Sequence, residues 1–176
     1  MADGSSDIDF QDSWQTDIAA HTIDRVIGLG LVPATVAREV VDGKVGSLQW
    51  FVEVMSTEAE RLEQQQNPRT WKTGMSKTVD RHLKNILVTK EFTLRLIDHS
   101  RAFRVNRSPA KPELLTRLSR TLLDGLPKLE KKDLQKQVGK YLMSSQIDRL
   151  LSRRDAILAL TKKRISDNGE ATVLYK

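Results

Sequence analysis

Apolar residues recur at helical spacing near the N-terminus and again over the last third of the chain. Residues 14–30 place Ile18, Ile23 and Val26 on one face, follow Ser13 as a capping residue and end in glycines. Three further segments have leucine-rich faces of the same period: 112–126, 131–143 and 144–168. The pattern therefore predicts a long helix near the start of the chain and three helices in its second half.

Apolar and β-branched residues form short runs bounded by turn residues between these helices. Four runs are predicted to be strands: 32–40, 47–55, 85–89 and 94–98. The dipeptide Asp42-Gly43 stands between the first two runs and is typical of a hairpin turn. Short helices are expected after Ser56 or Thr57 and over residues 70–82. These elements predict a fold of the α+β class, mainly α.

Composition excludes several classes of protein. Hydrophobic residues make up 39% of the 176 residues and aromatic ones only 5%, so the core is expected to consist mainly of Leu, Ile and Val. No apolar run approaches the roughly 20 residues of a membrane-spanning helix, and no basic region followed by an apolar one marks a secretion signal. Cysteine is absent, which excludes disulfides and fits a reducing compartment. We expect a cytoplasmic protein with no integral membrane segment.

Charge is distributed unevenly along the chain. Residues 1–100 contain 11 Lys and Arg against 15 Asp and Glu, whereas residues 101–176 contain 18 against 8. The positive excess in the second half is typical of solvated helix faces, but it also fits an anionic partner. Nucleic acid is not the favoured partner, because the basic residues of the last long helix are not interleaved with aromatic ones. The three histidines lack the spacing of zinc ligands.

Three polar residues border the last two predicted strands. Asp80 precedes Asn85 by five residues, and Asn85 precedes Asp98 by thirteen. Each of them alone is a common turn or strand-end residue. Together they supply a carboxylate that orients or deprotonates an acceptor hydroxyl and oxygen ligands that hold Mg²⁺ on the phosphates of ATP. The signature of protein kinases has the same order, Asp, Asn and Asp, with the same interval between the first two.

The two segments around these residues resemble a known family. DRHLKNILV, residues 80–88, is similar to the catalytic loop of phosphatidylinositol 3- and 4-kinases, and LIDHSRAF, residues 96–103, is similar to their metal-binding segment. The upstream stretches DIAAHTIDRVIGLGLVPATVAREV and GSLQWFVE resemble the helix, strand and hinge of a bacterial branch of kinase-like proteins. That branch is related to HipA-like and secretory-pathway atypical kinases. The resemblance covers most of the chain.

The resemblance implies a protein-kinase-like fold with a truncated N-terminal lobe and a set of site residues. Asp80 would act on the acceptor hydroxyl with support from His82, and Asn85 and Asp98 would bind Mg²⁺. The lobes would divide the chain into a lead-in over 1–12, an N-lobe remnant over 13–55 and a helical C-terminal lobe over 56–176. The hinge that would hold the adenine of ATP comprises Gln49, Trp50, Phe51, Val52 and Glu53.

Two features of the N-terminal part bear on this interpretation. Asp17 falls where the family has the Glu that pairs with the ATP-binding Lys. A Gly-rich loop and a strand Lys are expected before that helix, yet the only Lys among the first 50 residues is Lys44, which follows it. We therefore expect an incomplete N-terminal lobe, completed by an upstream segment or a protein partner, and little or no ATP turnover by the chain alone. Trp50 is otherwise more typical of a protein core.

Two functions follow as expectations. The first is ATP-dependent phosphoryl transfer to an unidentified lipid, protein or small-molecule acceptor. The alternative is a non-catalytic, pseudokinase-like or helical scaffold that binds an anionic or protein partner through the basic C-terminal half.

Overall fold

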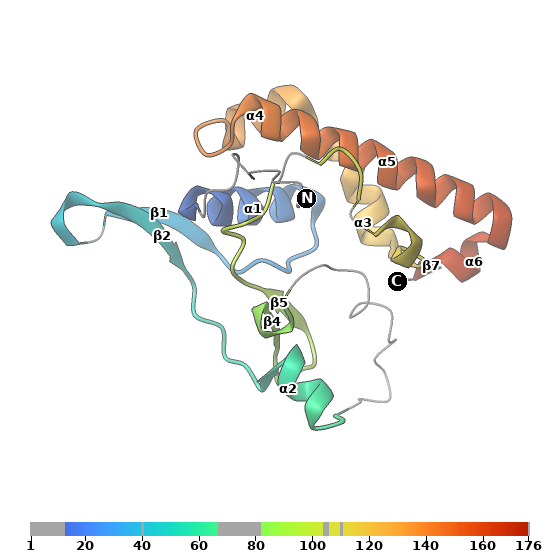
Figure 1. The fold of residues 1–176 in the computed structure, drawn as a ribbon, viewed down its shortest axis with the longest axis horizontal. Coiled ribbons are helices and arrows are strands. Elements are labelled where there is room, and N and C mark those ends of the chain that lie inside the picture. The colour runs from blue at the N-terminus through green and yellow to red at the C-terminus, as the bar shows by residue number, and fades with distance from the viewer. Residues whose placement is uncertain (1–12, 40, 67–81, 104–105, 110, 176) are drawn as a thin grey trace, which may run out of the picture.

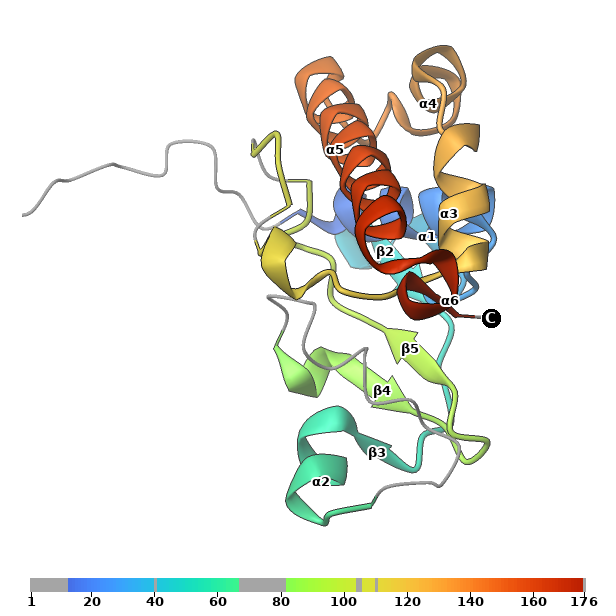
Figure 2. The same cartoon turned by 90° about the vertical axis from the view of Figure 1, so that its right-hand side faces the viewer.

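The computed structural model describes residues 13–39, 41–66, 82–103, 106–109 and 111–175. The chain has an α+β fold in which helix predominates, as the sequence predicts. Helix α1 (Trp14–Ile27) lies beneath a layer of helices, a long hairpin projects to one side, and a small sheet lies below (Figure 1). Figure 2 shows this sheet on the opposite side of α1 from the long helix α5 (Ser144–Asn168). In the described part of the chain, no helix is both long and apolar enough to cross a bilayer.

Helix α1 begins and ends where the sequence predicts. Ser13 Oγ accepts the N–H of Gln15 at 3.3 Å, and Gly28 ends the helix with a φ of 85°. Ala19 and Ile23 are buried in the largest hydrophobic cluster. The other members of that cluster come from the end of α1 and from the C-terminal helices and their connections: Ile27, Leu126, Leu129, Leu134, Val138, Leu142 and Ile147. Helix α1 is therefore fixed to the helical layer by apolar burial.

Strands β1 (Thr35–Glu39) and β2 (Val45–Gln49) pair antiparallel and form the first predicted hairpin. The predicted bounds of the second strand, 47–55, are wrong, because the strand begins two residues earlier and ends at Gln49. One further hydrogen bond joins the two segments, from the N–H of Trp50 to the carbonyl of Ala34 at 2.7 Å, whereas the N–H of Val32 donates to Asp24 Oδ2 at 3.3 Å. Residues 50–54 leave the hairpin without regular structure.

The second predicted hairpin belongs to a three-stranded antiparallel sheet in the order β3-β4-β5. Its strands are β3 (Ser56–Thr57), β4 (Ile86–Val88) and β5 (Leu94–Leu96). Helix α2 (Glu58–Glu63) begins with a capping box between Thr57 and Glu60 and packs against β4 and the 3₁₀ turn Leu83–Asn85. The predicted helix over 70–82 lies outside the described residues, except for His82.

The C-terminal half is helical but not divided as predicted. Besides α5, its helices are α3 (Arg120–Gly125), α4 (Lys131–Val138) and α6 (Glu170–Val173). The single helix predicted over 112–126 is wrong, because the short strand β6 (Leu118–Ser119) interrupts it. Leu118 is buried and pairs in parallel with Leu174 of β7 (Leu174–Tyr175), and Ser119 Oγ caps α3. A continuous helix would lose both contacts.

Candidate functional site

The open end of the β4–β5 hairpin brings two predicted site residues into contact. Asn85 ends the 3₁₀ turn before β4, and Asp98 follows β5. Asn85 Nδ2 donates to Asp98 Oδ2 at 2.7 Å, and the backbone N–H of Ile97 donates to the carbonyl of Asn85 at 3.1 Å. The thirteen-residue interval between Asn85 and Asp98 is therefore spanned by a hairpin that brings the two residues side by side.

The backbone of Asp98 has an uncommon conformation. Its φ is 57°, in the left-handed region that costs most non-glycine residues about 1–2 kcal/mol. Asp tolerates this region better than most residues, because its short carboxylate can accept local hydrogen bonds. Here Ser100 Oγ donates to Asp98 Oδ1 at 2.8 Å, so each carboxylate oxygen accepts a hydrogen bond. The side chain of Asp98 is nevertheless exposed to solvent.

Asp17 joins helix α1 to the segment that carries Asp98. Its Oδ1 accepts the backbone N–H of His99 at 2.6 Å, and its Oδ2 accepts the hydroxyl of Ser47 at 3.4 Å. His99 is buried, and its Nδ1 lies 3.9 Å from Asp17 Oδ1. The contact spans 82 positions in sequence, so no local pattern indicates it. The sequence led us to expect that Asp17 would pair with a lysine, and it gave no sign of the hydrogen bond from Asp17 to the backbone of His99.

Of the two residues predicted for catalysis, the structure describes only His82. Asp80 lies outside the described residues. His82 is exposed and starts the 3₁₀ turn, where its Nδ1 accepts the N–H of Lys84 at 3.3 Å. This contact fixes the residues just before Asn85. The supporting role of His82 in the loop stays a prediction.

Four of the five predicted hinge residues line a pocket. Gln49 ends β2, and its Nε2 donates to Thr35 Oγ1 at 3.0 Å. The pocket beyond it has a volume of about 650 Å³, and it is lined by Trp50, Phe51, Val52, Glu53 and, from β5, Arg95. The side chains of Trp50 and Phe51 are 75% and 82% exposed, so the interpretation of Trp50 as a core residue is wrong.

Basic residues of helix α5 hold other parts of the chain. Arg153 Nη1 donates to the carbonyl of Asn106 at 2.5 Å, and Arg164 Nη2 donates to that of Pro112 at 3.1 Å. Arg154 donates to the carbonyl of Leu129. Burial lowers the pKa of the Arg153 guanidinium. These arginines therefore fix backbone segments, which accounts for part of the positive excess of the C-terminal half.

The side chains at the open end of the β4–β5 hairpin can supply oxygen ligands for a small hard cation. Asp98 offers a carboxylate, and Asn85 offers an amide oxygen once its side chain is turned by half a rotation about its terminal bond. This turn gives up the hydrogen bond to Asp98 and leaves two oxygen atoms side by side, an arrangement that would require a bound cation. Oxygen ligands of this kind suit Mg²⁺, which keeps several waters and needs few protein groups. Among the described residues, no three His, Asp or Glu side chains gather into a metal cluster. A site here would therefore rest on the pair and on a bound phosphate.

Comparison with known proteins gave no relative for this chain: no family model matches it, and a search of curated proteins found no match. The geometry of the site is therefore the basis for the function proposed below.

Proposed function

We propose that this chain carries the metal-binding and hinge parts of an ATP-dependent phosphotransferase site, in a fold like that of phosphatidylinositol 3- and 4-kinases and HipA-like kinases. The observation that carries the proposal is the contact of 2.7 Å between Asn85 and Asp98 at the end of the β4–β5 hairpin. It supports the role that the sequence pattern gives to both residues. The acceptor would be a lipid, a protein or a small molecule.

The arrangement gives each residue a task. Asp98 and Asn85 would hold Mg²⁺, which when bound neutralises charge on the phosphates of ATP. Asp17 fixes the backbone next to Asp98 through its hydrogen bond to His99. Asp80 would orient the acceptor hydroxyl, five residues before Asn85 in the chain. Each of these tasks is positioning or charge neutralisation, which is what phosphoryl transfer requires of a protein.

The pocket beside residues 50–53 supports a nucleotide as the ligand. It is an open depression with a volume of about 650 Å³ rather than an enclosed cavity, so it would cover one side of a base. Trp50 and Phe51 offer exposed aromatic surface for a planar base, and Arg95 brings a positive charge to the same pocket. Among the residues that the structure describes, none pairs as a strand with the backbone of Val52, Glu53 or Val54, which would bind the edge of the base.

Calorimetric titration with ATP and Mg²⁺ tests the proposal. We expect binding that requires Mg²⁺ and is lost in Asp98→Ala. The matched control is Asp42→Ala, because Asp42 is an exposed aspartate with nearly the same backbone conformation, a φ of 63°, at the tip of the β1–β2 hairpin. Equal binding by all three proteins, or no binding in the wild type at millimolar ATP, would refute the proposed site.

A separate observation favours the alternative, a scaffold for an anionic partner. Four lysines recur every four residues: Lys128, Lys132, Lys136 and Lys140. They are exposed, and on α4 they lie opposite the buried Leu134 and Val138. Lys132 and Lys136 are separated by only about 40° around the axis of α4, and Lys128 and Lys140 flank the two ends of the helix. Binding to a polyanion such as heparin that weakens steeply with rising salt would support this function. The double variant Lys132→Gln, Lys136→Gln should not show this steep salt dependence.

A further inference from the structure

The outer edge of strand β2 presents unpaired backbone groups. The N–H of Trp50 donates to the carbonyl of Ala34 at 2.7 Å, which sets the hydrogen-bonding phase of the β1–β2 ladder. In this phase the even-numbered residues of β2 bond to β1, and the odd-numbered ones direct N–H and C=O outward. The outward residues are Val45, Ser47 and Gln49. In the described part of the chain, their backbone groups have no hydrogen-bond partner on that side.

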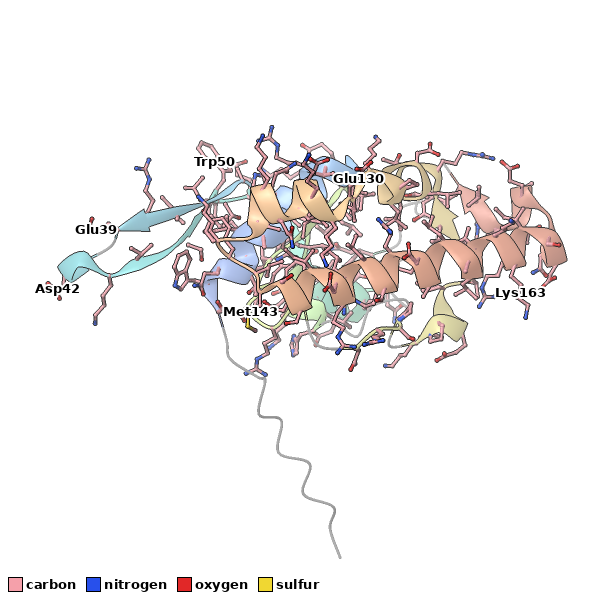
Figure 3. All side chains as sticks on the ribbon, turned by 90° about the horizontal axis from the view of Figure 1, so that it is seen from above. Glu39, Asp42, Trp50, Glu130, Met143 and Lys163 are labelled. Carbon is pink, nitrogen blue, oxygen red and sulfur yellow. The ribbon has the colours of Figure 1, made fainter. Side chains whose placement is uncertain are left out.

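This edge lacks the features that keep a strand from pairing with another chain. Strand β1 carries Arg38 and Glu39, whereas β2 has neither a charged residue nor a proline. The hairpin projects from the body of the molecule, with Glu39 and Asp42 toward its tip and Trp50 toward its base (Figure 3). Helix α1 packs against one face of the hairpin, but the outer edge of β2 gains no backbone hydrogen bonds from that packing. A further strand would therefore stabilise the hairpin.

One face of the hairpin is apolar and exposed. Val36 and Leu48 are paired across the ladder, with exposed fractions of 49% and 58%. Trp50 continues the same face by strand alternation and is 75% exposed. Ser47, on the other face, contacts Asp17 of α1. The apolar face thus points away from α1.

We propose that β2 pairs antiparallel with β2 of a second copy of this chain, with Ser47 opposite the partner's Ser47. In this register Val45 lies opposite the partner's Gln49. All outward backbone groups of both strands are then bonded, and a continuous sheet β1-β2-β2-β1 results. The pairing shares Trp50 with the nucleotide pocket but makes no use of Asn85 or Asp98. The crosslinking test below therefore reports on this assembly independently of the proposed function.

The side chains in this register complement each other. Gly46 lies opposite the partner's Leu48, and nothing lies within 4 Å of the position of a Cβ on Gly46. The leucine of one copy therefore has space over the glycine of the other, and this contact occurs twice because the axis is two-fold. Trp50 lies opposite the partner's Lys44, a pair suited to a cation–π contact. The strand is thus complementary to itself, which favours a second copy over an unrelated strand.

Disulfide crosslinking tests the register. The chain has no cysteine, so a single Ser47→Cys places one thiol per chain on the two-fold axis. Residues opposite each other in a ladder have Cα atoms about 4.5–5.5 Å apart, within reach of a disulfide. The control is Ala37→Cys, which directs its backbone to the outer edge of β1. We expect an oxidised dimer for Ser47→Cys and not for Ala37→Cys. Equal crosslinking of both, or of neither, would overturn the proposal.

Sedimentation velocity over a range of concentrations tests the assembly itself. We expect a monomer–dimer equilibrium for the wild type. Leu48→Glu should raise the dimer dissociation constant roughly a hundredfold, because apolar contact is lost twice. Val36→Glu, its neighbour across the ladder with similar exposure, should leave the constant within a few-fold. A wild-type monomer at all concentrations, larger assemblies, or equal effects of both variants would refute the edge pairing. Far-UV circular dichroism confirms that each variant is folded.

Discussion

Helix α2 contains a buried ion pair between Glu58 and Arg61. Arg61 Nε and Nη2 donate to the two carboxylate oxygens of Glu58 at 2.6 and 2.8 Å, and Arg61 Nη1 donates to the carbonyl of Gln66 at 2.7 Å. The two side chains are only 6% and 4% exposed. The hydrogen bond to Glu58 raises the pKa of Arg61. Replacing Arg61 with Leu would therefore leave a buried carboxylate without its main partner.

We expect Arg61→Leu to lower the free energy of unfolding by about 3–5 kcal/mol, the cost of an uncompensated buried charge. The double variant Glu58→Leu, Arg61→Leu should recover most of this loss, because it removes both charges. The matched control is Arg120→Leu, which breaks a contact of 2.5 Å to Glu170 between side chains 49% and 56% exposed. That exposed pair should contribute no more than about 1 kcal/mol.

Urea denaturation followed by circular dichroism measures these differences, provided that the slope with denaturant is the same for all variants. The reasoning fails if Arg61→Leu costs no more than Arg120→Leu. It also fails if the double variant is as unstable as Arg61→Leu. Because α2 packs against the turn that carries Asn85, Arg61→Leu should also weaken nucleotide binding.

Three further predictions follow from single contacts. Gly125→Ala should destabilise the fold by about 1–3 kcal/mol in urea denaturation, because a Cβ there would overlap the backbone of Ile27; an unchanged midpoint would contradict this packing. Asp17→Ala should lose about 1.5–3 kcal/mol of stability and weaken Mg²⁺-dependent ATP binding, whereas Asp17→Asn, which keeps an acceptor for His99, should lose less of both. Burial raises the pKa of Tyr175 above its ordinary value. Its contribution to stability is therefore present below about pH 10 and is lost as pH rises through the folded-state pKa. The difference between the ultraviolet titrations of the wild type and Tyr175→Phe should have a midpoint above about 10, and Tyr175→Phe should reduce the alkaline loss of stability.

Local signals in the sequence were sufficient for elements that local physics determines. A capping serine, an apolar face and a terminal glycine predicted α1, and the Asp42-Gly43 turn predicted the first hairpin. The helix predicted over 112–126 failed because its leucine period is compatible with a helix throughout. The parallel pairing of Leu118 with Leu174 interrupts it, and a contact between residues so far apart leaves no local trace.

In the candidate site, too, local sequence predicted some features, whereas contacts between residues far apart in sequence determined the others. The spacing of Asn85 and Asp98 around two short strands predicted that a hairpin would bring them together. In the structure, Asn85 Nδ2 lies 2.7 Å from Asp98 Oδ2. The role of Asp17 could not be predicted, because its partner is a backbone N–H, which every residue except proline has. The exposure of Trp50 could not be predicted either, since it depends on how the hairpin packs against the rest of the chain, which a local pattern does not specify.

The central claim is that Asn85 and Asp98 form a cation site that serves a nucleotide. Electron paramagnetic resonance of Mn²⁺, titrated with the protein in the presence of a non-hydrolysable ATP analogue, tests it most directly, because Mn²⁺ accepts the same oxygen ligands as Mg²⁺. The account predicts that the wild type and Asp42→Ala remove the free-ion signal beyond what the analogue alone removes, that Asn85→Ala does so more weakly, and that Asp98→Ala does not. A signal that Asp98→Ala reduces as much as the wild type would contradict the claim.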